Sequence, residues 1–211
     1  MRRALIFVWC LLPVAAGAYH YGPGQDRVRA DRAAEAVERA DAAVRAAQAI
    51  AAQDGDDAAR GLWAQAEEAY AEALELLPSD QVREGRALRL ERAKAQMYIS
   101  QLPEARRALE GLVEELASDA TSDPALLARA RAALGNAQYY TTWLMRLEGA
   151  PRDEWEPEID AARQNYKLLA ERAAKSGDEK AAGLSREDLE SAIRLARMDI
   201  AELQGLPLPS Q

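Results

Sequence analysis

An alternating spacing of four and three residues between small apolar side chains constrains this chain more than any other feature. Between Asp26 and Gln53 these side chains are Ala33, Val37, Ala40, Val44, Ala47 and Ala51. The spacing places them on one face of an α-helix, with arginines and acidic residues on the other faces. Because these side chains are small, a second helix can approach this face closely. The sequence therefore predicts a long amphipathic helix packed against a neighbour.

The composition extends this expectation to the whole chain. Alanine supplies 47 of the 211 residues, whereas aromatic residues make up 6%. Alanine, leucine, glutamate and arginine favour helix, and the β-branched and aromatic residues that favour strands are scarce. We therefore expect an all-α fold rather than an all-β or a doubly wound α/β fold. The formal net charge of −8 argues against a nucleic-acid-binding protein, which would need a basic face for phosphate contacts.

The first eighteen residues follow the pattern of a secretory signal peptide. Residues 1–3 are Met-Arg-Arg, residues 4–18 form an apolar run, and Ala16, Gly17 and Ala18 are the small residues that signal peptidase accepts. The run is shorter than the roughly 20 residues that span a membrane, but an uncleaved membrane anchor at residues 4–18 remains the alternative. Both interpretations place the rest of the chain outside the cytoplasm, in the periplasm or another extracytoplasmic compartment.

Cysteine and histidine are too scarce for most metal or disulfide sites. Cys10 is the single cysteine and lies inside the apolar run, where bulky Trp9 disfavours a lipoprotein cleavage site. His20 is the single histidine, which excludes any site that needs two imidazoles. The aspartates of residues 54–57 resemble a fragment of a calcium loop, but the closing glutamate of an EF-hand is absent. We expect neither a metal nor a cofactor.

Turn residues and prolines divide the remaining chain into seven predicted helices. A flexible segment, 19–25, precedes a helical domain, 26–203, and a proline-containing tail, 204–211, follows it. The predicted helices are 26–53, 58–77, 81–99, 104–117, 124–147, 158–175 and 185–203. Residues 149–157 are a predicted loop and residues 176–184 a polar linker. The short connections predict three antiparallel hairpins and a terminal helix.

One set of spacings in this region resembles the tetratricopeptide repeat (TPR) family. Ala66, Tyr70, Ala73 and Pro78 are spaced like the second helix and the closing proline of such a repeat. Residues 88–116 resemble a second, degenerate repeat, and Leu134-Gly135 resembles the Leu-Gly pair of a third. The resemblance implies a right-handed α-solenoid of stacked helix hairpins, ending in a C-terminal capping helix.

The match to the TPR family is incomplete. The first predicted helix is nearly twice the usual length, and Arg89 and Arg92 fall where the repeat has large apolar residues. The alternative fold is an unrelated alanine-rich helical bundle. Stacking is nevertheless expected on physical grounds, because each hairpin leaves an apolar side that only a neighbouring hairpin can cover.

The TPR resemblance also implies a binding groove. In that family the first helix of each hairpin lines a concave surface that binds extended peptides through amide, cationic and aromatic side chains. Carried onto this sequence, the groove positions are Lys94, Met97 and Tyr98 in one unit and Asn136, Tyr139 and Tyr140 in the next. The competing interpretation is that the aromatic residues fill space where alanine-lined helices diverge.

These features favour an exported protein–protein interaction module over an enzyme. We expect a scaffold or accessory subunit of a cell-envelope assembly that binds a protein or peptide partner and no nucleic acid. It would attach to a membrane only if residues 4–18 stay uncleaved. The alternative is a small-ligand receptor or a carboxylate-based enzyme that uses an aromatic pocket near Trp143 and Trp155.

We expect signal peptidase to cut after Ala18, because the apolar run is short and small residues precede this position. Protein recovered from an envelope fraction should then begin at Tyr19, as amino-terminal sequencing or intact-mass measurement would show. A chain that begins at Met1 in the integral-membrane fraction would identify an uncleaved anchor instead.

Overall fold

The computed structural model describes residues 23–204, with side chains from Gln25 onward. Over this range the chain is all-helical, with no strand, as the composition predicts. The predicted signal peptide with its cleavage position Ala18, together with Cys10, His20 and residues 205–211, lies outside the described residues.

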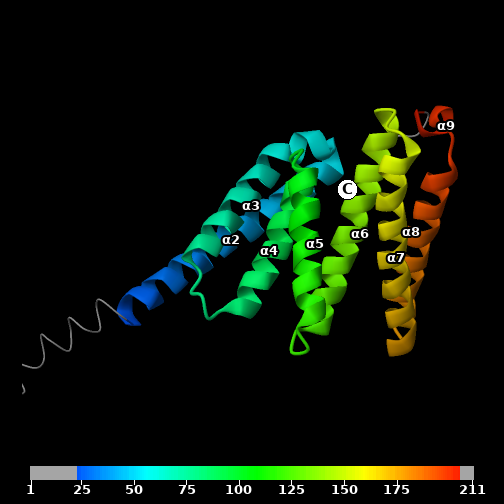
Figure 1. The fold of residues 1–211 in the computed structure, drawn as a ribbon. Helices are drawn as coiled ribbons and strands as arrows, with labels where there is room; N and C mark the ends of the chain where they lie inside the picture. The colour runs from blue at the N-terminus through cyan, green and yellow to red at the C-terminus, as the bar shows by residue number, and fades with distance from the viewer. Residues whose placement is uncertain (1–22, 205–211) are drawn as a thin grey trace, which may run out of the picture.

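The helices follow one another in a row, from the α2–α3 pair at one end to α8 at the other (Figure 1). They are α2 (Pro23–Asp54), α3 (Asp56–Leu76), α4 (Val82–Met97), α5 (Leu102–Ser118), α6 (Pro124–Leu147), α7 (Arg152–Ser176), α8 (Glu179–Arg197) and α9 (Ile200–Gln204). From α2 to α8 each helix packs against the next one in the chain, and α6 also contacts α4 and α9.

The predicted alanine face of α2 does pack against a neighbouring helix. Ala33, Ala40 and Ala47 are buried, and Val37 and Val44 are half-buried. The facing helix is α3, which presents a similar row of buried small residues: Ala59, Ala66, Ala69 and Ala73. Since few large side chains separate the two backbones, the helices pack closely over most of the length of α3. The turn between them is at Gly55, whose φ of 88° suits glycine.

The apolar core is divided along the row of helices rather than gathered in one centre. A first cluster lies between α2, α3 and α4, a second between α4, α5 and α6, and a third between α6, α7, α8 and α9. α6 contributes to both the second and the third cluster. The position of α6 therefore depends on packing from both sides.

Arg89 and Arg92, which the TPR resemblance matched to large apolar residues, form ion pairs. The Nε atom of Arg92 donates to Glu67 on α3 at 2.8 Å, and Gln96 donates to the same carboxylate oxygen at 3.1 Å. Arg89 donates to Glu115 on α5 at 2.6 Å. Polar side chains of α4 therefore make contacts with both of its neighbours along the chain.

α7 begins earlier than the sequence predicts. Residues 149–157 are a predicted loop, but α7 starts at Arg152 and contains Pro157. Pro157 lacks the N–H that would bond to the carbonyl of Asp153, so the helix loses one backbone hydrogen bond. Trp155 is buried in the third core cluster, and its packing offsets this loss.

Two further helix boundaries differ from the predicted ones. The predicted linker 176–184 is reduced to a short turn because Gly177 ends α7 in the left-handed conformation and Asp178 accepts a hydrogen bond from the N–H of Ala181 at 2.9 Å. This cap starts α8 at Glu179 rather than Ser185. At the other end of the chain, α2 begins at Pro23 rather than Asp26.

Gly135 allows α6 and α7 to pack closely. A Cβ atom at this position would lie 2.9 Å from Cε1 of the Tyr166 ring, which is closer than van der Waals contact permits. Tyr166 is itself buried, and its hydroxyl donates to Oδ1 of Asn136 at 2.8 Å. The Leu134-Gly135 pair therefore has a packing function in this fold.

We expect Gly135→Ala to destabilise the protein even though alanine favours helix over glycine by about 1 kcal/mol. The added methyl group must displace the buried ring of Tyr166, and overpacking of this kind costs about 1–3 kcal/mol. The net loss in the free energy of unfolding, measured by urea denaturation, should be about 1 kcal/mol. Gly111→Ala is the matched control, because Gly111 is exposed within α5 with open space around it. The control should be more stable than the wild type, and equal stabilisation by Gly135→Ala would contradict the packing argument.

Candidate functional site

Two adjoining hollows run along one side of α6. The first, of about 260 Å³, lies between α4 and α6, and we call it the α4–α6 hollow. Its lining residues are Leu90, Lys94, Met97 and Tyr98 from α4 and the residue after it, and Arg129, Ala132, Ala133, Asn136 and Tyr140 from α6. The second, of about 510 Å³, is the Leu144 hollow. Its lining residues are Asp56, Asp57, Arg60, Met97, Tyr98, Ser100, Leu102, Pro103, Tyr140, Trp143 and Leu144.

The two hollows lie next to each other, and we call them together the interhelical groove. They share Met97, Tyr98 and Tyr140, so these residues lie at the middle of the groove. On α6, Arg129 lies toward one end and Leu144 toward the other, with Asn136 between them. This part of α6 is about 22 Å long at a rise of 1.5 Å per residue. The groove therefore has the shape needed for an elongated ligand.

Most of the predicted groove residues come together here. Lys94, Tyr98, Asn136 and Tyr140 all line the α4–α6 hollow, as does Met97. Tyr139 lines neither hollow, and instead packs against the third core cluster. Adjacent residues of an α-helix point about 100° apart, and this rotation directs Tyr139 toward α7 and α8 while Tyr140 lines both hollows.

Lys94 and Arg129 form a cationic pair across the α4–α6 hollow. Nζ of Lys94 lies 2.7 Å from one carboxylate oxygen of Glu91, and Arg129 donates to the other oxygen. Both cations are close to half exposed or more, whereas the Glu91 side chain is only 25% exposed. The cluster has a net positive charge, and its cations are the more accessible part.

The tyrosines at the middle of the groove are held in place by their surroundings. The Tyr98 ring stacks on Trp63 of α3, with ring centroids 4.1 Å apart and planes 8° from parallel. Burial raises the pKa of Tyr98, and the charge of Asp56 raises it further. Burial also raises the pKa of Tyr140. Both hydroxyls are therefore neutral at physiological pH.

Arg129 and Leu144 were not predicted as groove residues. The signal was present, because positions 129, 133, 136, 140 and 144 follow the helical spacing that places residues on one face. Extending this spacing in both directions from Asn136 would have found both residues. Asp56 and Arg60 could not have been found in this way, because they approach the groove from α3.

The predicted aromatic pocket near Trp143 and Trp155 is largely filled by protein. Both tryptophans are buried in the third core cluster. Arg146 lies over the Trp155 ring, with its Cζ atom 4.8 Å from the ring centroid, and donates to the backbone carbonyls of Leu195 and Met198 at the end of α8. These residues therefore hold α6, α7 and α8 together. Trp143 also borders the Leu144 hollow, but Trp155 does not line it.

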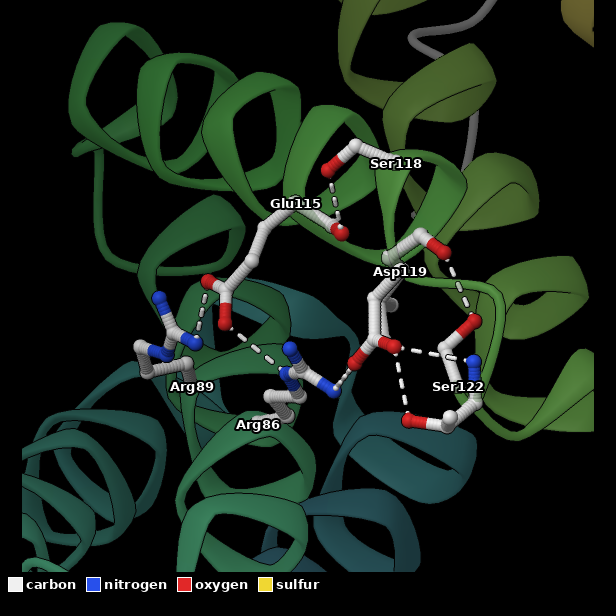
Figure 2. A network of polar contacts seen from close by, with 8 residues as sticks. Arg86, Arg89, Glu115, Ser118, Asp119 and Ser122 are labelled. Carbon is white, nitrogen blue, oxygen red and sulfur yellow. Dashed lines mark hydrogen bonds and ion pairs between the residues drawn. The ribbon is translucent and has the colours of Figure 1, made fainter.

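A second charged cluster lies at the opposite end of α4 (Figure 2). Arg86 donates to Glu115 at 2.8 Å and to Asp119 at 2.7 Å, and Arg89 donates to the second oxygen of Glu115. Asp119 also accepts hydrogen bonds from the hydroxyl and the N–H of Thr121. Because the charges of this cluster pair with one another, we assign it to holding the α5–α6 loop against α4.

The described residues offer few other sites. In the range 23–204, no group of three or more histidine, cysteine or acidic residues is placed to hold a metal ion. None of the helices in that range is long and apolar enough to cross a membrane. Comparison with protein-family models, curated proteins and solved structures finds no match to the chain.

The Arg86 cluster predicts a loss of stability in acid. The hydrogen bonds from Thr121 and Arg86 lower the pKa of Asp119 from 3.8 to about 2, so Asp119 stabilises the fold above pH 4 and this contribution disappears as the pH falls from 4 to 2. Asp119→Asn should therefore melt at a lower temperature than the wild type at pH 7, and the difference should shrink toward pH 2.

Glu114→Gln is the control for this measurement, since Glu114 is exposed on the same helix. Its melting temperature at pH 7 should equal that of the wild type. If the difference in melting temperature between the wild type and Asp119→Asn stays constant from pH 7 to pH 2, the assignment of the pKa shift is contradicted.

Proposed function

We propose that this chain is a protein–protein interaction module that binds an extended peptide segment in the interhelical groove. The observation that carries the proposal is the meeting of Lys94, Tyr98, Asn136 and Tyr140 in one hollow. These residues were expected in a groove from the TPR resemblance. They supply a cation, two aromatic rings and an amide, which together suit a peptide backbone and its side chains.

We also propose that the helices form a degenerate TPR-like stack. Three observations support this arrangement. Consecutive helices pack in chain order, α6 packs against both α4 and α5 of the preceding hairpin, and Gly135 of the Leu134-Gly135 pair receives a buried tyrosine from the next helix. In such a stack, α4 and α6 would be the first helices of adjacent hairpins, which line the concave side.

The dimensions of the groove suit a short extended peptide. The segment of α6 along the groove is about 22 Å long, and an extended chain advances about 3.3 Å per residue. About six or seven residues of a partner would therefore fill it. Asn136 accepts the Tyr166 hydroxyl through Oδ1, which leaves its amide nitrogen as a donor for a peptide carbonyl.

The cellular setting in this proposal rests on the amino-terminal sequence. With residues 1–18 acting as an export signal, the module would work in the periplasm or another extracytoplasmic space. Its role there would be that of a scaffold or accessory subunit of an envelope assembly, without catalytic activity.

A small-ligand receptor is the second candidate. The observation in its favour is the Leu144 hollow, because about 510 Å³ lies within the usual range for small-molecule sites and Trp143 and Tyr140 line it. To test this, a variant is made in which Trp143 is the only tryptophan. A small metabolite bound in the hollow would change the fluorescence of this variant. A peptide-binding module would give the same change only with peptides.

The test of the proposed function is selection from a library of nonapeptides, each flanked by glycine-serine linkers so that neither peptide terminus takes part. The wild type should enrich binders, and a groove variant with Lys94→Ala, Asn136→Asp and Tyr140→Leu should lose them. Asn136→Asp keeps the acceptor for Tyr166 but removes the amide donor. The three changes together should weaken binding at least tenfold, since a single central contact often contributes more than 1 kcal/mol.

The matched control carries Arg107→Ala, Gln164→Ala and Lys167→Ala, which change exposed residues of α5 and α7. It should bind like the wild type, and circular dichroism should show the same helicity for all three proteins. The proposal fails if no peptide is enriched, or if a folded groove variant binds the enriched peptides as tightly as the wild type does.

A further inference from the structure

The two ends of the interhelical groove carry opposite charges. At the end of the α4–α6 hollow, Lys94 and Arg129 share the single carboxylate of Glu91, which leaves one net positive charge. The Leu144 hollow is lined by two aspartates, Asp56 and Asp57, and by one arginine, Arg60, which leaves one net negative charge. An elongated ligand in the groove therefore meets a different charge at each end.

The ion pairs at each end of the groove determine which charged side chains can interact with a ligand. Arg60 pairs with Asp57 on its own helix, and no hydrogen bond or ion pair of the Asp56 side chain is found among the described residues. The charge of Asp56 raises the pKa of both Tyr98 and Tyr140, so its field extends to the middle of the groove. Asp56 is thus the carboxylate most available to a basic side chain.

The middle of the groove between these ends is largely apolar. Met97 and the rings of Tyr98 and Tyr140 line both hollows, and Leu144, toward the end of the groove that holds Asp56, is 44% exposed. An exposed leucine beside aromatic rings favours apolar side chains of a ligand over charged ones. The groove is therefore charged at both ends and apolar between them.

The positive end of the groove is opposite in sign to the net charge of the chain. With a formal net charge of −8, the molecule repels acidic partners at long range. At 0.15 M salt this repulsion is screened beyond about 8 Å, so an acidic side chain that reaches Lys94 and Arg129 interacts mainly with their local charge. An acidic residue of a partner would then be accepted at this end of the groove and disfavoured over most of the remaining surface.

From this arrangement we infer that the groove selects an extended peptide segment with an acidic side chain at one end, a basic side chain at the other and apolar side chains between them. The acidic side chain lies at Lys94 and Arg129, and the basic side chain lies at Asp56. They lie on either side of Met97, Tyr98 and Tyr140, the residues that both hollows share. This inference rests on the proposed function, because it specifies the ligand of the same groove.

The test uses the flanked nonapeptide library and variants that change one end at a time. Lys94→Gln with Arg129→Gln leaves Glu91 as the only charge at its end, so that end becomes negative. Asp56→Lys makes the opposite end positive. Glu114→Lys, at an exposed position of α5, makes the same acid-to-base change away from the groove and serves as the control.

The wild type and the control should enrich peptides with an acidic residue toward one end, a basic residue toward the other and apolar residues between them. The Lys94→Gln, Arg129→Gln variant should enrich peptides with basic residues at both ends, and Asp56→Lys should enrich peptides with acidic residues at both ends. Neutralising one charged residue of a selected peptide should weaken its binding to the wild type about two- to fivefold in low salt, and less in high salt.

The possible failures separate the two proposals. Enriched peptides that need Tyr140 and Asn136 but show no opposite charges at their ends would overturn the charge inference and leave the peptide-binding function standing. The same conclusion would follow if the charge variants selected the same peptides as the wild type. An absence of enriched peptides, or enrichment that the groove variant retains, would overturn both proposals.

Discussion

Close packing between helices with small facing residues is the interaction on which the rest of this structure depends. Alanines of α2 and α3 face one another, and Gly135 of α6 leaves room for the ring of Tyr166 on α7. Side chains this small bury little apolar surface individually, so the helices gain stability by close contact along much of their length. Since α6 is packed from both sides, the same contacts fix the helix that carries most of the groove.

Charged residues of α4 decide how that helix is held between its neighbours. Arg92 pairs with Glu67 of α3, while Arg86 and Arg89 pair with acidic residues of α5. Such contacts depend on geometry as well as on burial, so they orient α4 about its axis. The opposite edge of α4 then presents Lys94 and Tyr98 to the groove. The polar interfaces and the candidate site are therefore two consequences of one helix orientation.

The sequence predicted the helices well where periodicity is strong and poorly where tertiary packing decides. The long α2 and the start of α6 at Pro124 follow from local signals. The early start of α7 does not, because burial of Trp155 outweighs the proline that suggested a loop. In the groove, the TPR resemblance predicted Asn136, Tyr139 and Tyr140 together, and Tyr139 packs against the third core cluster instead. The approach of α3 required the three-dimensional fold.

Asn136 belongs to the groove and to the helix packing at the same time. Its Oδ1 atom satisfies the hydroxyl of buried Tyr166, and its exposed side lines the α4–α6 hollow. Substitutions that alter the ligand preference at this position must therefore keep an acceptor for the phenol. Few side chains can therefore replace Asn136. Lys94 and Arg129 have no comparable role in core packing, so substitutions at these positions are less restricted. Homologous chains would then acquire new ligands by changing the charges at the ends of the groove while its centre stays the same.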